Sequence, residues 1–171
     1  MGQKKTYRLT WVAGLISYSE ATRFTPQKYL KTVQWCKANN RPVPRYTLYP
    51  RTKGFVTMVK ELAGTSSVTA VYDLTIAYAH QERFMEAPGF WESVAEPHSD
   101  QGWRFHIHVD RFEIADLMGK SDTELAKWLE TRWMAKSKRL EQLRSDLENG
   151  RDWAPKATTN GVNGFNGKKH Q

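Results

Sequence analysis

The stretch that most constrains the fold is an apolar run at residues 11–16, followed at once by the polar sequence Ser-Glu-Ala-Thr-Arg-Phe-Thr-Pro at residues 19–26. The run predicts a buried strand over residues 11–18 that ends in a polar turn and leads into a helix. Thr25 suits the N-cap, and Pro26 suits the first helical position because no backbone N–H is needed there. Glu20 and Arg23 are therefore expected at the carboxyl end of a strand, where open α/β sheets bind ligands.

This pair of opposite charges has two interpretations. The guanidinium of Arg23 can grip an anionic substrate while the carboxylate of Glu20 orients it. Alternatively, the two side chains form a structural ion pair that joins the strand to the helix. The residue types alone leave both open.

A second strand-to-helix turn follows the first helix, which is predicted over residues 26–38. Residues 43–49 predict a short strand, and the sequence Tyr-Pro-Arg-Thr-Lys-Gly at residues 49–54 leads into a helix that Gly64 closes. Thr52 is the expected N-cap, with Arg51 and Lys53 beside it. Cations at a helix N-terminus favour an anion site, although a plain loop with solvated basic residues has the same sequence.

Two further strands are predicted. Residues 67–78 predict a central strand covered on both faces, in which buried Asp73 requires a basic partner. Residues 103–110 alternate, and we expect the side with Phe105 to face the core and the side with His106, His108 and Asp110 to face solvent. That polar side carries the residue types of a metal site or an acid–base pair, but its loose spacing favours a solvated face and no metal.

The remaining landmarks are a helix, a tail and one cysteine. A capping box at residues 121–124 and Gly150 bound a long helix with an apolar leucine stripe. Residues 1–10 are expected to fray, residues 11–153 to form one domain, and residues 154–171 to be disordered. Cys36 lies at helical spacing among apolar residues, so it is a predicted core residue, and a single cysteine excludes an intrachain disulfide.

Charge is distributed unevenly along the chain. Residues 1–60 contain twelve Lys or Arg and one acid, Glu20, a charge of +11, whereas the whole chain carries +8. Such a basic half predicts an anionic partner: phosphate groups, anionic lipid or nucleic acid. The sequence shows no membrane-spanning run and no signal peptide.

Three blocks in order resemble the 1-acylglycerol-3-phosphate acyltransferases. They are Glu-Ala-Thr-Arg-Phe-Thr-Pro-Gln-Lys-Tyr from residue 20, Leu-Tyr-Pro-Arg-Thr-Lys-Gly-Phe from residue 48, and Val-Tyr-Asp-Leu-Thr-Ile from residue 71. The resemblance covers residues 11–150 and implies the C-terminal part of an acyltransferase domain, an α/β fold with a mixed sheet, flanking helices and a long amphipathic helix. Ala21 departs from the glycine that the family motif usually has.

The resemblance implies a role for each matched residue. Substrate binding is assigned to Glu20, Thr22, Arg23, Pro50, Arg51 and Lys53. The first three would form the pocket for the lysophosphatidic acid head group, and the others would lie near acceptor and acyl-CoA phosphates. The implied reaction transfers a fatty acyl group from acyl-CoA, a co-substrate, to a lysophospholipid hydroxyl in phospholipid biosynthesis. No bound cofactor is implied.

One family motif is missing from this sequence. Acyl transfer needs a base for the hydroxyl proton, which the family supplies as His-x-x-x-x-Asp upstream of the Glu-x-x-Arg block. No histidine here has an aspartate at that spacing, so we expect part of a longer enzyme, with no catalytic residue of its own and no activity alone. We expect it at an anionic membrane surface of the endoplasmic reticulum or another endomembrane. The alternatives are a non-catalytic protein that binds anionic lipid or regulates, and, last, a nucleic-acid-binding module.

Overall fold

The computed structural model describes residues 14–63, 65, 67–85, 90–91, 102–151 and 153, and these form an α/β fold, as predicted. A three-stranded sheet has β1 (Ala70–His80) at its centre, between β2 (Arg83–Phe84) and β3 (Trp103–Glu113). Both pairings are antiparallel, and β1 and β3 pair along their whole length. The central position of β1 is thus confirmed. The expected frayed end and disordered tail lie outside the described residues.

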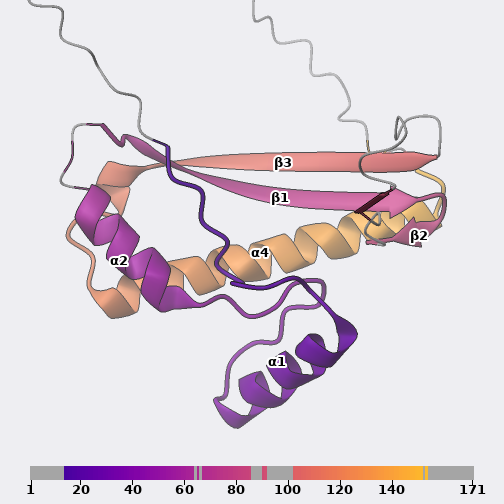
Figure 1. Cartoon of the computed structure of the whole chain (residues 1–171), viewed down its shortest axis with the longest axis horizontal. Helices are drawn as coiled ribbons and strands as arrows, with labels where there is room; N and C mark the ends of the chain where they lie inside the picture. The colour runs from indigo at the N-terminus through magenta and orange to yellow at the C-terminus, as the bar shows by residue number, and fades with distance from the viewer. Residues whose placement is uncertain are drawn as a thin grey trace, which may run out of the picture.

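Helix α4 (Asp122–Glu148) runs beneath the sheet along β1 and β3 (Figure 1). Its start is the predicted capping box, in which Ser121 and Glu124 exchange side-chain and backbone hydrogen bonds. Gly150 follows the helix with φ of +64°, a conformation that favours glycine, so the predicted end is confirmed as well. The predicted stripe is buried at Leu125, Leu129, Leu140, Leu143 and Leu147.

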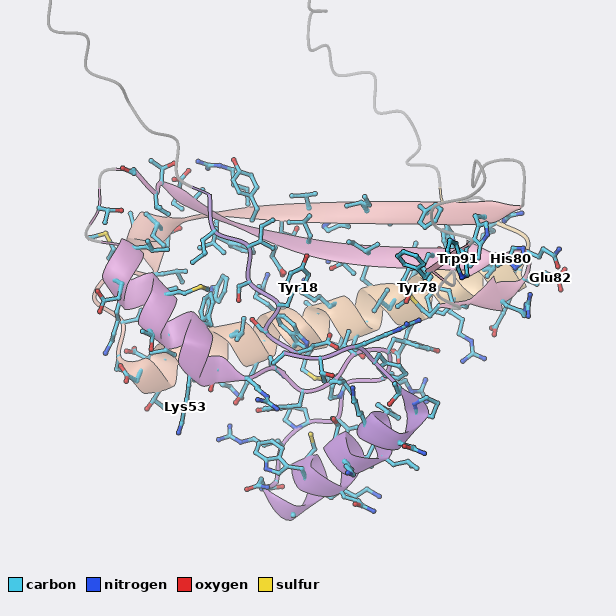
Figure 2. All side chains as sticks on the ribbon, in the orientation of Figure 1. Tyr18, Lys53, Tyr78, His80, Glu82 and Trp91 are labelled. Carbon is cyan, nitrogen blue, oxygen red and sulfur yellow. The ribbon has the colours of Figure 1, made fainter. Side chains whose placement is uncertain are left out.

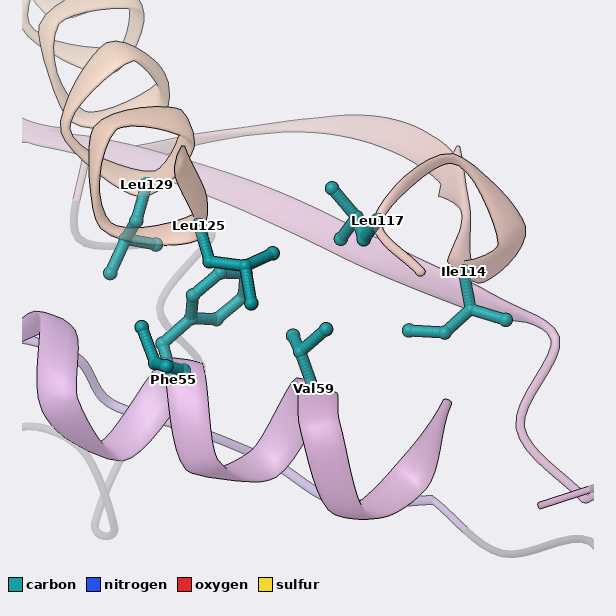
Figure 3. Close-up of a cluster of buried hydrophobic side chains, with 7 residues drawn as sticks. Phe55, Val59, Ile114, Leu117, Leu125 and Leu129 are labelled. Carbon is teal, nitrogen blue, oxygen red and sulfur yellow. The ribbon is translucent and has the colours of Figure 1, made fainter. Parts of the chain in front are cut away.

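Two hydrophobic clusters occupy the two ends of α4. At one end, Phe55 and Val59 of α2 (Thr52–Leu62) pack against Leu125 and Leu129 (Figure 3). At the other, Ala77 and Ala79 of β1 are fully buried under Leu140, Leu143, Leu147 and Trp153. The small alanine side chains let the helix approach the sheet closely there.

Helix α1 (Pro26–Ala38) has the predicted bounds and lies apart from the sheet, below α4 (Figure 1). The hydroxyl of Thr25 accepts a hydrogen bond from the Lys28 N–H, so the predicted N-cap is confirmed. Cys36 is fully buried, as expected. In α2 the N-cap is Arg51, in an extended conformation, and Thr52 is the first helical residue, so the predicted cap was wrong by one position.

Neither predicted strand of the N-terminal half is a strand where the structure describes it, and residues 11–13 of the first lie outside the described residues. Residues 14–18 are exposed coil, and among the described residues no strand pairs with them. Residues 43–49 are also irregular, because this segment runs along α4 and bonds to it instead: the Arg45 N–H donates to the Ser137 hydroxyl at 2.8 Å. Pro44 also removes an N–H group that a ladder would need.

The alternating strand β3 presents its faces the other way round from the prediction. Phe105, Ile107 and Val109 are 50%, 59% and 50% exposed. Together with three exposed residues of β1, they form a surface that we call the open sheet face: Tyr72, Leu74, Ile76, Phe105, Ile107 and Val109. Because Tyr72, Leu74 and Ile76 are exposed, β1 is not covered on both faces, contrary to the prediction.

The polar face of the sheet lies against α4 because it finds charged partners there. Asp73 and Asp110 are opposite each other across the ladder, and like charges in that position repel. Each carboxylate is paired with a cation from α4, Asp73 with Lys136 and Asp110 with Arg139. The expected partner of Asp73 is therefore Lys136. No described helix combines the length and apolar content that a bilayer span requires.

The reversed faces predict opposite effects of two substitutions. Ile107→Thr on the open sheet face should change the free energy of unfolding by no more than about 0.5 kcal/mol. Leu140→Ala beneath the sheet should cost about 2–5 kcal/mol, because it leaves a cavity. Urea unfolding followed by circular dichroism measures both. If Ile107→Thr proved as costly as Leu140→Ala, the assignment of the faces would be wrong.

Candidate functional site

The two predicted anion-binding turns lie next to each other. The backbone N–H of Arg51, the N-cap of α2, donates a hydrogen bond to the carbonyl of Ser19 at 2.7 Å. Residues about thirty positions apart in sequence are thereby joined where the polar turn meets the start of α2. The structure thus brings the two turns together without the strands that were expected to carry them.

The Glu20 side chain is partly buried, whereas the residues that follow it in the turn are exposed to solvent. Its carboxylate is half-buried. Burial raises the pKa of Glu20 above the ordinary value for a glutamate, although the polar groups of the Leu48 backbone and the Trp133 side chain and the charge of Lys136 oppose the shift. Among the described residues no ion pair joins Glu20 to Arg23. Glu20 is therefore half-buried and forms no ion pair with Arg23, so neither interpretation of the pair holds as it was stated.

Arg23 and Thr22 lie on the exposed side of the same turn. Lys28, in the first turn of α1, donates from Nζ to the Thr22 hydroxyl at 2.5 Å and to the Arg23 carbonyl at 3.4 Å. These bonds fold the backbone of the turn over the start of α1 and leave the Arg23 guanidinium in solvent. Sequence reasoning did not select Lys28, although its position after Pro26 in the first block was the available signal.

The second turn contributes residues of two kinds. Pro50 is buried, while Arg51 and Lys53 are exposed. Lys53 projects from α2 away from the sheet (Figure 2), so of these two cations Arg51 is the one whose backbone is tied to the first turn. Arg23 and Arg51 thus come from two segments joined by one hydrogen bond, and the acid of the first turn faces away from solvent.

Tyr78 of β1 was not predicted to be near this site. Burial raises the pKa of its hydroxyl; the charge of Arg23 opposes that shift and the charge of Glu20 adds to it. These influences place the Tyr78 hydroxyl within the electrostatic reach of the turn. No signal in the sequence singles out Tyr78 among the aromatic residues of its strand.

The backbone conformation of Ala21 explains why glycine would be favoured at this position. Its φ is +56°, and its N–H donates to the Tyr18 carbonyl at 2.8 Å, closing a tight turn just before Arg23. A non-glycine residue in this region is strained by roughly 1–2 kcal/mol. The methyl group is therefore tolerated at a local cost.

His106 and His108 of β3 lie on the side of the sheet that faces α4, so the expectation that this side faces solvent was wrong. His106 Nδ1 lies 3.1 Å from the Trp153 carbonyl, and His108 Nε2 lies 2.9 Å from Asp110 Oδ1. The hydrogen bond from His108 is the main reason why the pKa of Asp110 is lowered. Within the described part of the chain, no group of acidic, histidine or cysteine side chains is arranged to hold a metal ion.

Similarity searches connect the chain with glycerolipid acyltransferases. It is 49% identical over 112 residues to human 1-acyl-sn-glycerol-3-phosphate acyltransferase gamma, covering 66% of this chain and 27% of the relative. It is 31% identical over 128 residues to 1-acyl-sn-glycerol-3-phosphate acyltransferase 2 of Brassica oleracea, covering 75% and 30%. Zebrafish lysocardiolipin acyltransferase 1 is 29% identical over 132 residues, covering 75% and 31%.

The chain therefore spans less than a third of the length of these relatives. No protein-family model and no solved structure matches it. The resemblance drawn from the three blocks is confirmed, as a match to part of each relative.

The strain at Ala21 predicts that Ala21→Gly stabilises the protein by about 1 kcal/mol, since glycine adopts positive φ without a steric cost. The melting temperature should rise by roughly 2–4 °C. Ala38→Gly, in the last turn of α1 with ordinary helical geometry, is the matched control and should lower it. Equal falls in both variants would show that Ala21 is unstrained.

Proposed function

Since the chain matches 1-acyl-sn-glycerol-3-phosphate acyltransferases, we propose that it carries the acceptor-binding part of such an enzyme. The reaction transfers a fatty acyl group from acyl-CoA to lysophosphatidic acid or a related lysophospholipid, in phospholipid biosynthesis. The observation that carries the proposal is the hydrogen bond between Arg51 and Ser19. It unites the two blocks that the family resemblance assigns to substrate, and beside it Arg23 and Arg51 are exposed while Glu20 is turned away.

The chemistry suits a phosphate monoester at this site. A guanidinium offers paired N–H donors in a plane, which match two phosphate oxygens. Arg23 reaches solvent from a turn whose backbone is held by Lys28, so little freedom is lost when an anion binds. Thr22, Arg51 and Lys53 complete the predicted binding residues, and buried Pro50 shapes the approach to α2.

The reaction itself needs a group that this sequence does not supply. The acceptor hydroxyl oxygen attacks the thioester carbonyl, a base takes the hydroxyl proton, and coenzyme A leaves as a thiolate that is then protonated. His106 and His108 are bonded to Trp153 and Asp110 beneath the sheet, away from Arg23. We therefore assign the base to polypeptide outside these 171 residues.

Two exposed apolar surfaces support the proposal that the chain is part of a larger domain. The open sheet face presents six large side chains to solvent on adjacent strands, and Leu15, Ile16 and Tyr18 are exposed in the coil before the site. Surfaces of this kind on a soluble domain normally contact something. Polypeptide that the longer relatives carry is the occupant that the proposal requires.

Membrane contact is a further part of the proposal. Phe90 and Trp91 are both exposed and in ring contact with each other, which suits insertion at a lipid interface. The basic N-terminal half would face the anionic lipid of the endoplasmic reticulum or another endomembrane. A non-catalytic protein that binds anionic lipid would use the same site, and the lack of a His-x-x-x-x-Asp sequence favours that second candidate. Nucleic acid is not the proposed partner.

The central prediction is that acceptor affinity depends most on Arg23. Arg23→Ala should weaken binding of a short-chain lysophosphatidic acid, kept below its micelle concentration, by about 1.5–3 kcal/mol, or one to two orders of magnitude. Arg23→Lys should already weaken it, because an ammonium cannot replace a two-pronged contact. Titration calorimetry measures the affinities, and circular dichroism checks the fold.

Lys37→Ala is the matched control, since Lys37 is exposed in the last turn of α1, at the opposite end from the site, and should leave the affinity unchanged. If Arg23→Ala bound as well as the parent protein while Arg51→Ala did not, the anion site would lie at the second turn.

A separate prediction is that the chain alone does not catalyse acyl transfer. With lysophosphatidic acid and a long-chain acyl-CoA, it should release coenzyme A no faster than buffer, because the sequence lacks the His-x-x-x-x-Asp motif that would supply the base. A thiol-reactive dye follows the release. Turnover that His106→Ala abolished would place the base in this chain and overturn the assignment.

A further inference from the structure

Strand β3 has one edge that no strand of the described residues covers. It lies at one margin of the sheet and pairs with β1 alone (Figure 1). At one end of this ladder the Ile114 N–H donates to the Thr69 carbonyl at 2.9 Å, and at the other the Gln81 N–H donates to the Gly102 carbonyl at 3.0 Å. Bonded pairs recur at every second residue of an antiparallel ladder, so the even-numbered residues of β3 bond to β1. The odd-numbered residues therefore direct their backbone groups to the other edge.

This edge combines open backbone groups with exposed apolar side chains. Ile107 and Val109 belong to it, and both are also part of the open sheet face. Within the described part of the chain, nothing bonds to the outward N–H and C=O groups of Ile107, Val109 and Arg111. Arg111 would guard the edge by its charge, but Glu113 pairs with it. Such an edge is a template for a further strand.

The opposite edge of the sheet, along β1, is blocked. By the same alternation the Leu74 carbonyl points away from β3, and there the Lys136 ammonium bonds to it. Further along, the Met85 N–H donates to the Tyr78 carbonyl at 2.8 Å beside the short strand β2. A lysine and a short strand are both devices that prevent additional pairing. At Ile107 and Val109 the edge of β3 has neither, so it is the edge at which another strand can add.

We propose that a second copy of the chain occupies this edge, with the two β3 strands antiparallel across a two-fold axis. Two identical antiparallel strands place the same edge of each copy in contact, as a two-fold interface requires. Because β3 runs from Trp103 to Glu113, the register that pairs it over its whole length is centred on His108. In that register Ile107 of each copy exchanges both backbone hydrogen bonds with Val109 of the other.

The side chains of β3 are self-complementary in this register. No two carboxylates are opposite each other, and no two Lys or Arg side chains are. Arg111 is instead opposite Phe105 of the second copy, which permits a cation–π contact. Ile107 and Val109 gain an apolar neighbour across the new pair of strands. A second copy thus fits the edge in both its hydrogen bonds and its side chains.

The inference goes beyond the proposed function and does not depend on it. Edge pairing extends the sheet sideways, so the open sheet face remains available to the layer that the proposed function requires. The turn that carries Arg23 takes no part in the contact.

The first test is the oligomeric state, measured by sedimentation velocity from about 1 to 100 μM protein. We expect the parent to dimerise. Val109→Pro removes an N–H only from the outer edge, where proline is tolerated, so the ladder with β1 keeps its bonds. It should weaken dimerisation at least roughly tenfold, because each dimer loses two backbone bonds. Ile107→Lys, which places an ammonium group at the same edge, should do the same if the proline variant fails to fold by circular dichroism.

Ile76→Lys is the matched control. Ile76 is opposite Ile107 in the β1–β3 ladder and is exposed on the same face, but it lies one strand away from the edge. This variant should dimerise as the parent does. Equal loss of the dimer in Ile76→Lys and Ile107→Lys would overturn the proposal, because the two copies would then meet through their sheet faces.

Hydrogen exchange followed by NMR provides the second readout. The amides of Ile107 and Val109 should exchange more slowly at high protein concentration than at low, since they become bonded in the dimer. The amide of Ile76 points to the opposite edge and should not change. A protein that stays monomeric over the whole range, or a dimer without added protection at Ile107 and Val109, would overturn the proposal.

Discussion

Three buried polar side chains of α4 connect separate parts of the chain to this one helix. Glu130 pairs with Arg41 at 3.1 Å, Lys136 pairs with Asp73 of β1, and Ser137 accepts the Arg45 N–H at 2.8 Å. They fasten the end of α1, the central strand and the segment before α2 to one helix. Because burying a charge is favourable only with its partner in place, removing one member of such a pair typically costs about 3–5 kcal/mol. The arrangement is therefore specific in a way that leucine packing alone is not.

The two faces of the sheet differ in what covers them. The two aspartates on its polar face, Asp73 and Asp110, are paired with cations of α4, whereas its apolar face is open to solvent. A sheet normally buries the face that carries Phe, Ile and Val. The reversal makes physical sense if the ion pairs with α4 determine which face of the sheet is buried and the apolar face contacts another layer. The same layer would give the exposed Leu15 and Ile16 a neighbour.

The sequence predicted the helices well and the strands less well, for different physical reasons. The helices begin at local sequence signals, which are Thr25 with Pro26 for α1 and the Ser121–Glu124 capping box for α4. A strand depends on a neighbour that local sequence does not name. Residues 14–18 have none among the described residues, and residues 43–49 find polar partners on α4 instead. For β3 the alternation was correct and the buried side was wrong, because the partners of Asp110 and His106 come from distant segments.

For the candidate site, the sequence indicated two turns but not their geometry. The blocks at residues 20 and 48 were singled out, and one hydrogen bond from Arg51 to Ser19 does bring them together. The direction of Glu20 was not foreseen, since Trp133 and Lys136 lie more than a hundred residues further along the chain.

The turn concentrates two local costs within four residues. Ala21 adopts a conformation that favours glycine, and next to it Glu20 holds a carboxylate whose burial raises its pKa. Since neither feature stabilises the fold by itself, packing elsewhere must compensate for both. Such costs are common where a backbone must present one side chain in a fixed direction, and under the proposed function that side chain is Arg23.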